Sequence, residues 1–122
     1  MSSYKDLDIY KISLELFYIV HAASLKLPKY EMYELGSQLR RSSDSVPTNI
    51  VEGYGRKRYK ADFIKFLTYS WASSLETVSH IEKIAKLYPG IIENEQEFIS
   101  RYNELSAKIY NFIKYVEENW RT

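Results

Sequence analysis

The 122-residue chain has the length of one domain and a formal net charge of +1. It contains no cysteine, which excludes disulfide bonds, thiolate zinc sites and cysteine nucleophiles. Four Gly and three Pro are too few for a turn-rich β protein, so we expect an all-α fold. The first eight residues carry acids where a signal peptide is basic, and the longest apolar run, residues 16–23, is too short to span a bilayer. These features predict a cytoplasmic protein without a membrane segment.

The first helix is predicted over residues 6–27. Apolar residues recur at three- and four-residue steps in two adjacent stripes. One passes through Leu7, Tyr10, Leu14, Phe17 and His21, the other through Ile9, Ile12, Leu16, Ile19 or Val20, Ala23 and Leu27. The resulting apolar face is wider than a simple surface helix needs. The helix should end at Leu27, because the residue before Pro28 avoids helical geometry.

The second helix is predicted to begin near Glu31 and to continue past Pro47 to Gly53 and Gly55. Pro47 lacks an amide hydrogen and clashes with the carbonyl of Ser43, so we expect a kink there and not two helices. The many small residues of this segment would allow a neighbouring helix to approach closely.

A third helix is predicted over residues 60–88, ended by Pro89–Gly90, and a fourth begins at Asn94. Glu97 stands three residues after Asn94, the spacing of a capping box. The connections are short, which places consecutive helices side by side. We therefore predict one domain over residues 1–122, an up-down-up-down antiparallel four-helix bundle with its second helix kinked at Pro47.

Residues for metal binding or catalysis are sparse. A di-iron bundle needs repeated Glu-x-x-His pairs, whereas this chain offers one Glu76/His80 pair at a different spacing, and His21 lies in an apolar stripe. No Ser is placed with a base and an orienting acid in a way that would also build an oxyanion hole. Glu52 is interpreted as a carboxylate bound by Asn49, a Ser or an Arg in a packed interface. The sequence predicts no enzyme, no metal and no cofactor.

A basic segment is the best candidate for function. Residues 38–60 carry two acids, Asp44 and Glu52, against six bases, which are Arg40, Arg41, Arg56, Lys57, Arg58 and Lys60. Clustered cations bind phosphates, and Tyr54 and Tyr59 offer ring faces for stacking on unpaired bases. The alternative interpretation is a solvated corner that contributes only solubility.

Self-association is the second expectation. Twelve Tyr exceed what one small core needs, and Tyr suits half-buried contact surfaces. Together with the wide apolar face of the first helix, they indicate a homo-oligomer. Symmetry would then repeat the basic segment.

The centre of the chain resembles a known bacterial family. The similarity is strongest over residues 38–56 (QLRRSSDSVPTNIVEGYGR) and extends to residues 4–10, 27–35, 63–67 and 72–77. The family comprises four-helix bundle proteins encoded within intervening sequences of large-subunit ribosomal RNA genes. Two positions differ from its pattern: Val51 stands where Ala is expected, and Ser73 where Gly is frequent.

The resemblance implies a homopentamer and kinship with the accessory variability proteins of diversity-generating retroelements, which are basic pentamers that bind nucleic acid. We therefore expect a non-enzymatic oligomer that binds RNA or DNA through the six basic residues. The alternative is a scaffold whose ring binds another protein and has no nucleic-acid role. A third, weaker hypothesis is an enzyme that uses Glu52 or the Glu76/His80 pair.

Overall fold

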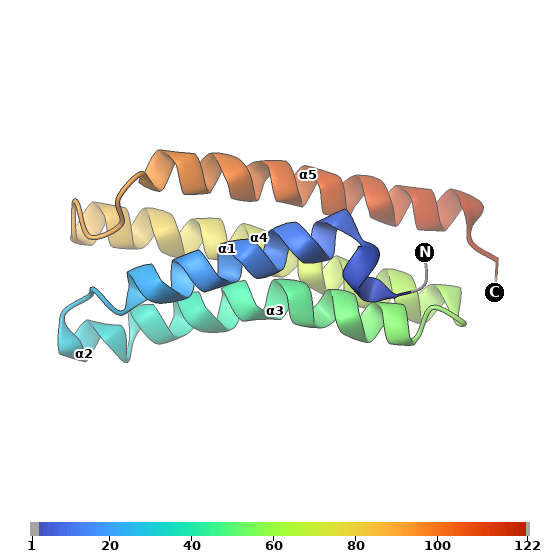
Figure 1. Cartoon of the computed structure of the whole chain (residues 1–122), viewed down its shortest axis with the longest axis horizontal. Helices are drawn as coiled ribbons and strands as arrows, with labels where there is room; N and C mark the ends of the chain where they lie inside the picture. Colours follow the sequence, from blue (N-terminus) through green and yellow to red (C-terminus); the bar gives the residue numbers. More distant parts are fainter. Residues whose placement is uncertain (1–2, 122) are drawn as a thin grey trace.

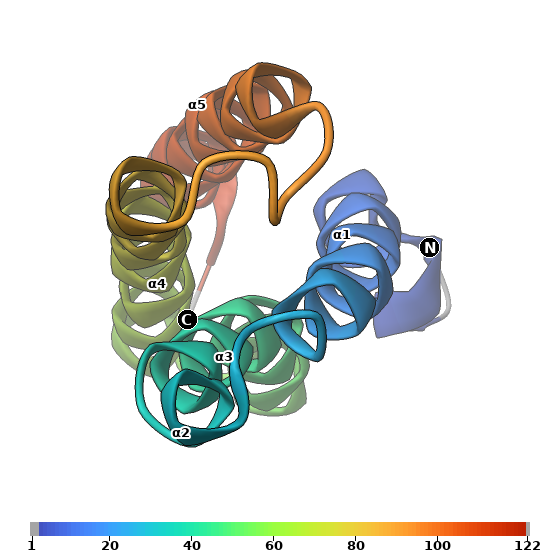
Figure 2. The ribbon, with the colours of Figure 1, turned by 90° about the vertical axis from the view of Figure 1, so that its left-hand side faces the viewer.

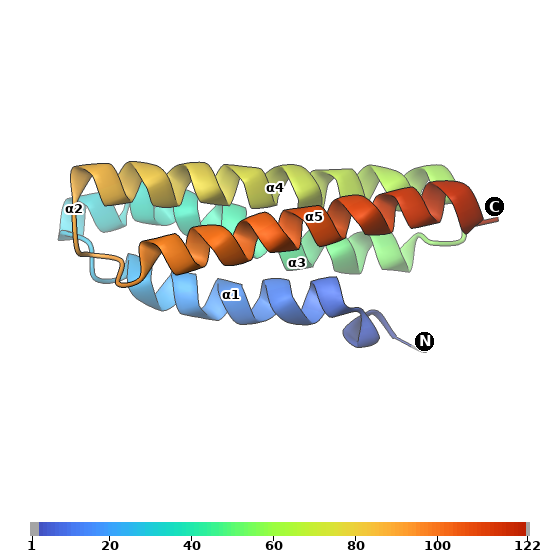
Figure 3. The ribbon, with the colours of Figure 1, turned by 90° about the horizontal axis from the view of Figure 1, so that it is seen from above.

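The computed structural model describes residues 3–121 and is built almost entirely of helices. Four of them are long: α1 (Asp8–Ser24), α3 (Leu35–Gly55), α4 (Lys60–Leu87) and α5 (Glu95–Asn119). They alternate in direction and lie along one another as a bundle (Figures 1 and 3). Seen end-on, α1 and α4 occupy opposite corners, with α3 and α5 at the other two (Figure 2). The predicted all-α, up-down-up-down bundle is confirmed.

The first helix is shorter than predicted at both ends. Leu7 has extended backbone angles, so α1 begins at Asp8. Residues Tyr4–Asp6 form a separate 3-10 turn, η1, capped by the hydroxyl of Ser3, which accepts the amide hydrogen of Lys5 at 3.1 Å. At the other end, α1 stops at Ser24, and a tight turn continues to Leu27 before Pro28.

The second helix is interrupted, which the apolar periodicity did not predict. A single turn, α2 (Lys29–Met32), follows Pro28, and Glu34 then leaves helical geometry with φ −104° and ψ −90°. The helix restarts at Leu35, where the absent side chain of Gly36 leaves room for Leu27: a Cβ there would lie 3.3 Å from its Cδ1. From Leu35, α3 continues through Pro47 without a break (Figure 1). The predicted single helix across Pro47 is confirmed, and the kink there stays a prediction.

The third predicted helix agrees with α4 to within one residue, but the predicted capping box at the start of the fourth is wrong. Asn94 does precede α5, with left-handed backbone angles of φ 57° and ψ 39°. Its side chain caps no amide; its backbone carbonyl accepts from Glu97 and Phe98 at 3.0 and 3.2 Å. The start of α5 is therefore formed by a left-handed residue, Asn94, and no side chain of that residue caps the helix.

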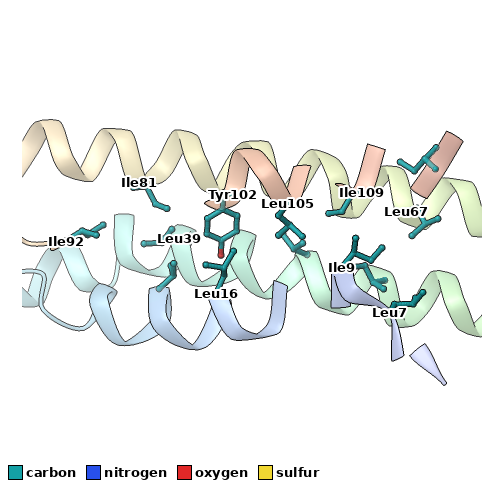
Figure 4. Packing of buried hydrophobic residues seen from close by; sticks show 14 of the residues in the cluster. Leu7, Ile9, Leu16, Leu39, Leu67, Ile81, Ile92, Tyr102, Leu105 and Ile109 are labelled. Atoms are coloured by element: carbon teal, nitrogen blue, oxygen red, sulfur yellow. The ribbon is translucent and has the colours of Figure 1, made fainter. Parts of the chain in front are cut away.

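Apolar side chains from all four long helices meet in one core, including Leu16, Leu39, Ile81 and Tyr102 (Figure 4). Small polar residues line the seam between α3 and α4. Ser70 donates to the carbonyl of Val46 at 2.8 Å, and Ser73, one of the two residues that depart from the family pattern, shares a 2.8 Å hydrogen bond with Ser45. Their short side chains let the two helices approach closely while their hydroxyls remain hydrogen-bonded.

The side of the bundle between α1 and α5 is less closed than the other three. Three hollows lie along it: a small one of about 130 Å³ beside Ile12 and Leu105, and two larger ones on either side of the ion pair of Glu15 and Arg101 at 3.3 Å. One, of about 330 Å³, is lined in part by Leu7, Ile9 and Phe112. The other, of about 490 Å³, lies between the end of α1 and the start of α5.

Candidate nucleic-acid interface

The basic joint, residues 56–60, connects α3 to α4 at the end of the bundle where the chain also begins and ends (Figure 1). α3 ends at Gly55, and the amide of Arg56 still bonds the carbonyl of Gly53 at 3.0 Å. A tight turn follows, closed by the amide of Tyr59 on the carbonyl of Arg56 at 2.9 Å. The joint is therefore a hydrogen-bonded corner with a defined backbone.

The last turn of α5 covers the joint and fixes its position. The indole Nε1 of Trp120 donates to the carbonyl of Lys57 at 2.8 Å, and its ring meets Phe63 edge-on at 5.2 Å. The ammonium of Lys60 donates to the carbonyl of Glu117 at 2.6 Å. A cation here also offsets the negative end of the α5 dipole.

Aromatic rings position the cations of the joint. The Lys57 Nζ lies 3.8 Å from the centre of the Tyr54 ring, and the Tyr54 ring in turn contacts Tyr4. The Arg58 guanidinium lies 5.9 Å from the ring of Tyr59. A cation over a ring face is attracted by the ring quadrupole, which restricts a side chain that would otherwise sample many rotamers. Tyr54 and Tyr59 thus hold cations, a role the sequence did not reveal.

The charge of Arg56 is largely compensated within the chain. Its guanidinium lies 2.9 Å from Glu52 and 3.7 Å from Asp62, and it covers the ring of Phe66 at 4.9 Å. Among residues 3–121, no ion pair involves Lys57 or Arg58. These two side chains, Arg58 exposed and Lys57 half-buried, carry the positive charge of the joint that no acid of the described chain compensates.

Arg40 and Arg41 lie toward the other end of α3. Fifteen residues of helix separate Arg41 from Arg56, about 22 Å along the axis. Arg40 is half-buried, and its guanidinium donates to the Ser24 hydroxyl and to the Met32 carbonyl, both at 2.9 Å. Arg41 is exposed. The six predicted residues therefore form two separate groups. Arg40 connects α3 to α1 and α2 through its hydrogen bonds to Ser24 and Met32.

One basic residue near the joint was not singled out from the sequence. Arg121 is exposed and directly follows Trp120, whose indole sits on the joint. Nothing in the periodicity of the fourth helix signalled this placement, because it depends on how α5 meets the α3–α4 turn.

The weaker catalytic candidates are exposed or paired. Glu52 is bound to an Arg, Arg56, as predicted, but its side chain is half-exposed and is not packed within the described chain. His80 is buried, with its Nε2 at 3.3 Å from Glu76. His21 contacts the ring of Phe17. Within residues 3–121, no three His, Cys, Asp or Glu side chains are grouped as metal ligands, and no helix has the length and apolar character of a membrane span.

Comparison with known proteins agrees with this fold. The chain is similar to a crystal structure of a protein of unknown function from the S23 ribosomal protein family of Bacteroides thetaiotaomicron, with a TM-score of 0.75 and 22% identity. The similarity covers 87% of this chain and 95% of the other. None of the curated proteins matches the chain. The family model described as 23S rRNA-intervening sequence protein matches residues 5–111, and the chain belongs to this family.

Proposed function

We propose that the protein is a non-enzymatic homo-oligomer of the bacterial cytoplasm that binds RNA through the basic joint. Lys57 and Arg58 make the principal phosphate contacts, supported by Arg56, Lys60 and Arg121. Arg41 extends the contact along α3. The observation that carries the proposal is a rigid corner, hydrogen-bonded by Trp120, on which two unpaired cations are held over aromatic rings.

The small number of outward cations explains why assembly matters. Each phosphate contact makes the negative slope of log K against log salt steeper, by about 0.7 for single strands or 0.9 for duplexes. A chain that makes only two such contacts therefore binds weakly at physiological salt. A ring repeats the joint, and the resemblance to pentameric proteins indicates five copies. Phosphate contacts also carry little sequence information, which fits a protein that recognises RNA by its backbone.

The family description supports RNA as the nucleic acid, because it refers to intervening sequences of 23S ribosomal RNA. Phosphate contacts alone do not distinguish RNA from DNA, so DNA of the same structure is the natural competitor. Comparing an RNA hairpin with its DNA equivalent measures this preference.

The test is the salt dependence of RNA binding, measured by fluorescence anisotropy with a labelled hairpin. Replacing Lys57 and Arg58 with Gln should reduce the salt slope by about 1.4–1.8 per chain in contact with RNA. The matched control replaces Lys83 and Lys86, two exposed lysines at the far end of α4, and should leave the slope unchanged. Absent or salt-insensitive binding by the unmodified protein would overturn the proposal.

The hollows between α1 and α5 favour one alternative, a scaffold that binds another protein. The one lined by Leu7, Ile9 and Phe112 offers an apolar floor beside Lys108 and Asp8. A specific partner retained on the immobilised protein after nuclease treatment, and lost when Phe112 becomes Asp, would support this alternative.

A further inference from the structure

α1 and α4 each carry a long stretch without charge on a surface helix. Residues 16–25 contain no Asp, Glu, Lys or Arg, and neither do residues 66–75. Both stretches nevertheless reach solvent: Tyr18 on α1 and Leu25, directly after it, are 62% and 52% exposed, and Leu75 on α4 is 43% exposed. A surface helix without charge over nearly three turns is typical of one that another protein covers.

Six exposed positions of α1 and the turn that follows it coincide with six exposed positions of α4 when the numbering is shifted by 50; Tyr69 on α4, which is 46% exposed, has a half-buried counterpart in Ile19. The α1 stripe consists of Lys11, Glu15, Tyr18, Ala22, Leu25 and Lys26, and the α4 stripe of Ala61, Lys65, Thr68, Ala72, Leu75 and Glu76. The first five residues of each stripe step by four, three, four and three, the spacing that keeps a seam of residues on one face of a helix pair. The two faces can therefore pack along their whole length.

The charges that bound the stretches are complementary. Glu15 precedes the α1 stretch and Lys26 follows it, whereas Lys65 precedes the α4 stretch and Glu76 follows it. Eleven residues, about 16 Å, separate the two charges in each helix. Parallel packing brings opposite charges to the same level at both ends, and antiparallel packing would bring like charges together.

The two helices cannot pair within one chain, because they lie at opposite corners of the bundle (Figure 2). They do point in the same direction, since α3 reverses the chain once and α4 reverses it again. One copy can thus pack its α1 against the α4 of the next while both bundles stay parallel. A contact between two different faces of identical copies generates a ring if it closes.

We propose that the α1 stripe of one copy packs, in parallel, against the α4 stripe of a second copy of this chain. This proposal rests on the homo-oligomer of the proposed function and identifies the surfaces that build it. Ala22 and Ala72 fall at the same level, where their small side chains allow close approach. Because all bundles point the same way, every basic joint reaches the same rim of the ring.

Engineered cysteines test this contact cleanly, because the chain has none of its own. Oxidation of an Ala22→Cys variant mixed with an Ala72→Cys variant should give a disulfide-linked dimer, whereas either variant alone should stay uncrosslinked. The double variant should give a ladder of linked chains. The matched control pairs Ala22→Cys with Ala107→Cys, an exposed alanine on α5, and should not crosslink.

A charge exchange provides a second readout by light scattering. Lys65→Glu should shift the protein toward monomer, since it places Glu beside Glu15. Adding Glu15→Lys together with Arg101→Glu, which preserves the ion pair of residues 15 and 101 within the chain, should restore the oligomer. An oligomer in which Ala22→Cys and Ala72→Cys form no disulfide with each other would overturn the proposed interface and leave self-association intact. Crosslinking of one variant with itself would overturn it in favour of a two-fold contact. A monomeric unmodified protein would overturn both the interface and the oligomeric part of the proposed function.

Discussion

The indole of Trp120, one residue past the end of α5, donates a 2.8 Å hydrogen bond to the backbone carbonyl of Lys57, in the turn between α3 and α4. Sixty-three residues separate the two in sequence. The bond joins the fourth long helix to the connection that carries the basic joint. It thereby makes the geometry of the basic joint a property of the folded bundle.

Two replacements of Trp120 should distinguish what its hydrogen bond contributes to stability from what its ring packing contributes. Trp120→Phe keeps a ring against Phe63 and loses the bond to Lys57, so we expect the free energy of unfolding to fall by about 1 kcal/mol. Trp120→Ala loses both, and a fall of about 3 kcal/mol is expected. Urea denaturation measures both values. Equal losses for the two variants would contradict a role for the hydrogen bond.

Arg40 and Arg41 should behave differently although they are neighbours. Arg40→Gln removes two hydrogen bonds that connect α3 to Ser24 and Met32, and should lower the free energy of unfolding by about 2 kcal/mol. Arg41→Gln removes an exposed charge and should change it by less than about 0.5 kcal/mol. Thermal unfolding followed by circular dichroism compares the two. If Arg41→Gln were the more destabilising variant, the assignment of Arg40 as a structural residue would fail.

Gly53 and Gly55 form a matched pair that tests the close approach of α3 and α4. A Cβ on Gly53 would lie 3.2 Å from the Cβ of Phe66, whereas a Cβ on Gly55 would meet no atom within 4 Å. Gly53→Ala should therefore destabilise the protein by about 1 kcal/mol despite the better helix propensity of Ala. Gly55→Ala should be neutral or slightly stabilising. A stabilising Gly53→Ala, measured in urea, would show that the helices can separate freely.

Tyr102 is fully buried, and its hydroxyl has no hydrogen-bond partner among the described residues. Tyr102→Phe should therefore stabilise the protein by about 1 kcal/mol at pH 7. Burial also raises the pKa of Tyr102 above its usual value of about 10. Since the folded state keeps the proton that the unfolded state releases, stability should fall as the pH rises above about 10.

The stabilisation at pH 7 and its pH dependence are checked by urea unfolding of the unmodified protein and of Tyr102→Phe. The measurements are made at pH 7 and at pH 10.5, about half a unit above the usual tyrosine pKa. The advantage of Tyr102→Phe should grow at the higher pH, because phenylalanine has no proton to retain. A variant that is less stable than the unmodified protein at pH 7 would show that the hydroxyl has a partner.

The architecture was predictable because it depends on local patterns. The period of the apolar residues fixed the four long helices, and the bounds of α4 were correct to one residue. The break at Glu34 and the left-handed start of α5 at Asn94 were missed, since both depend on how the ends of helices pack together. A capping-box spacing does not reveal whether the backbone turns left before the helix begins.

The candidate site was predicted only in part for the same reason. The run from Arg56 to Lys60 is visible in the sequence. The Phe66 ring beneath Arg56 comes from α4, however, and the carbonyl that binds Lys60 comes from α5. The grouping of Arg40 with Arg56 suggested one basic surface, although a straight helix keeps them about 24 Å apart along its axis. Counting charges over a stretch of sequence therefore grouped residues that the length of α3 places far apart.

The central claim is that an assembled ring of this protein binds RNA through its basic joints. Light scattering of the protein, alone and with an RNA hairpin, over a series of salt concentrations tests assembly and binding together. The mass without RNA should be a multiple of 14.5 kDa at every salt concentration, because the proposed contact is mainly apolar. RNA should add to that mass at low salt and dissociate as the salt rises. A mass of 14.5 kDa throughout, unchanged by RNA at the lowest salt, would contradict the account.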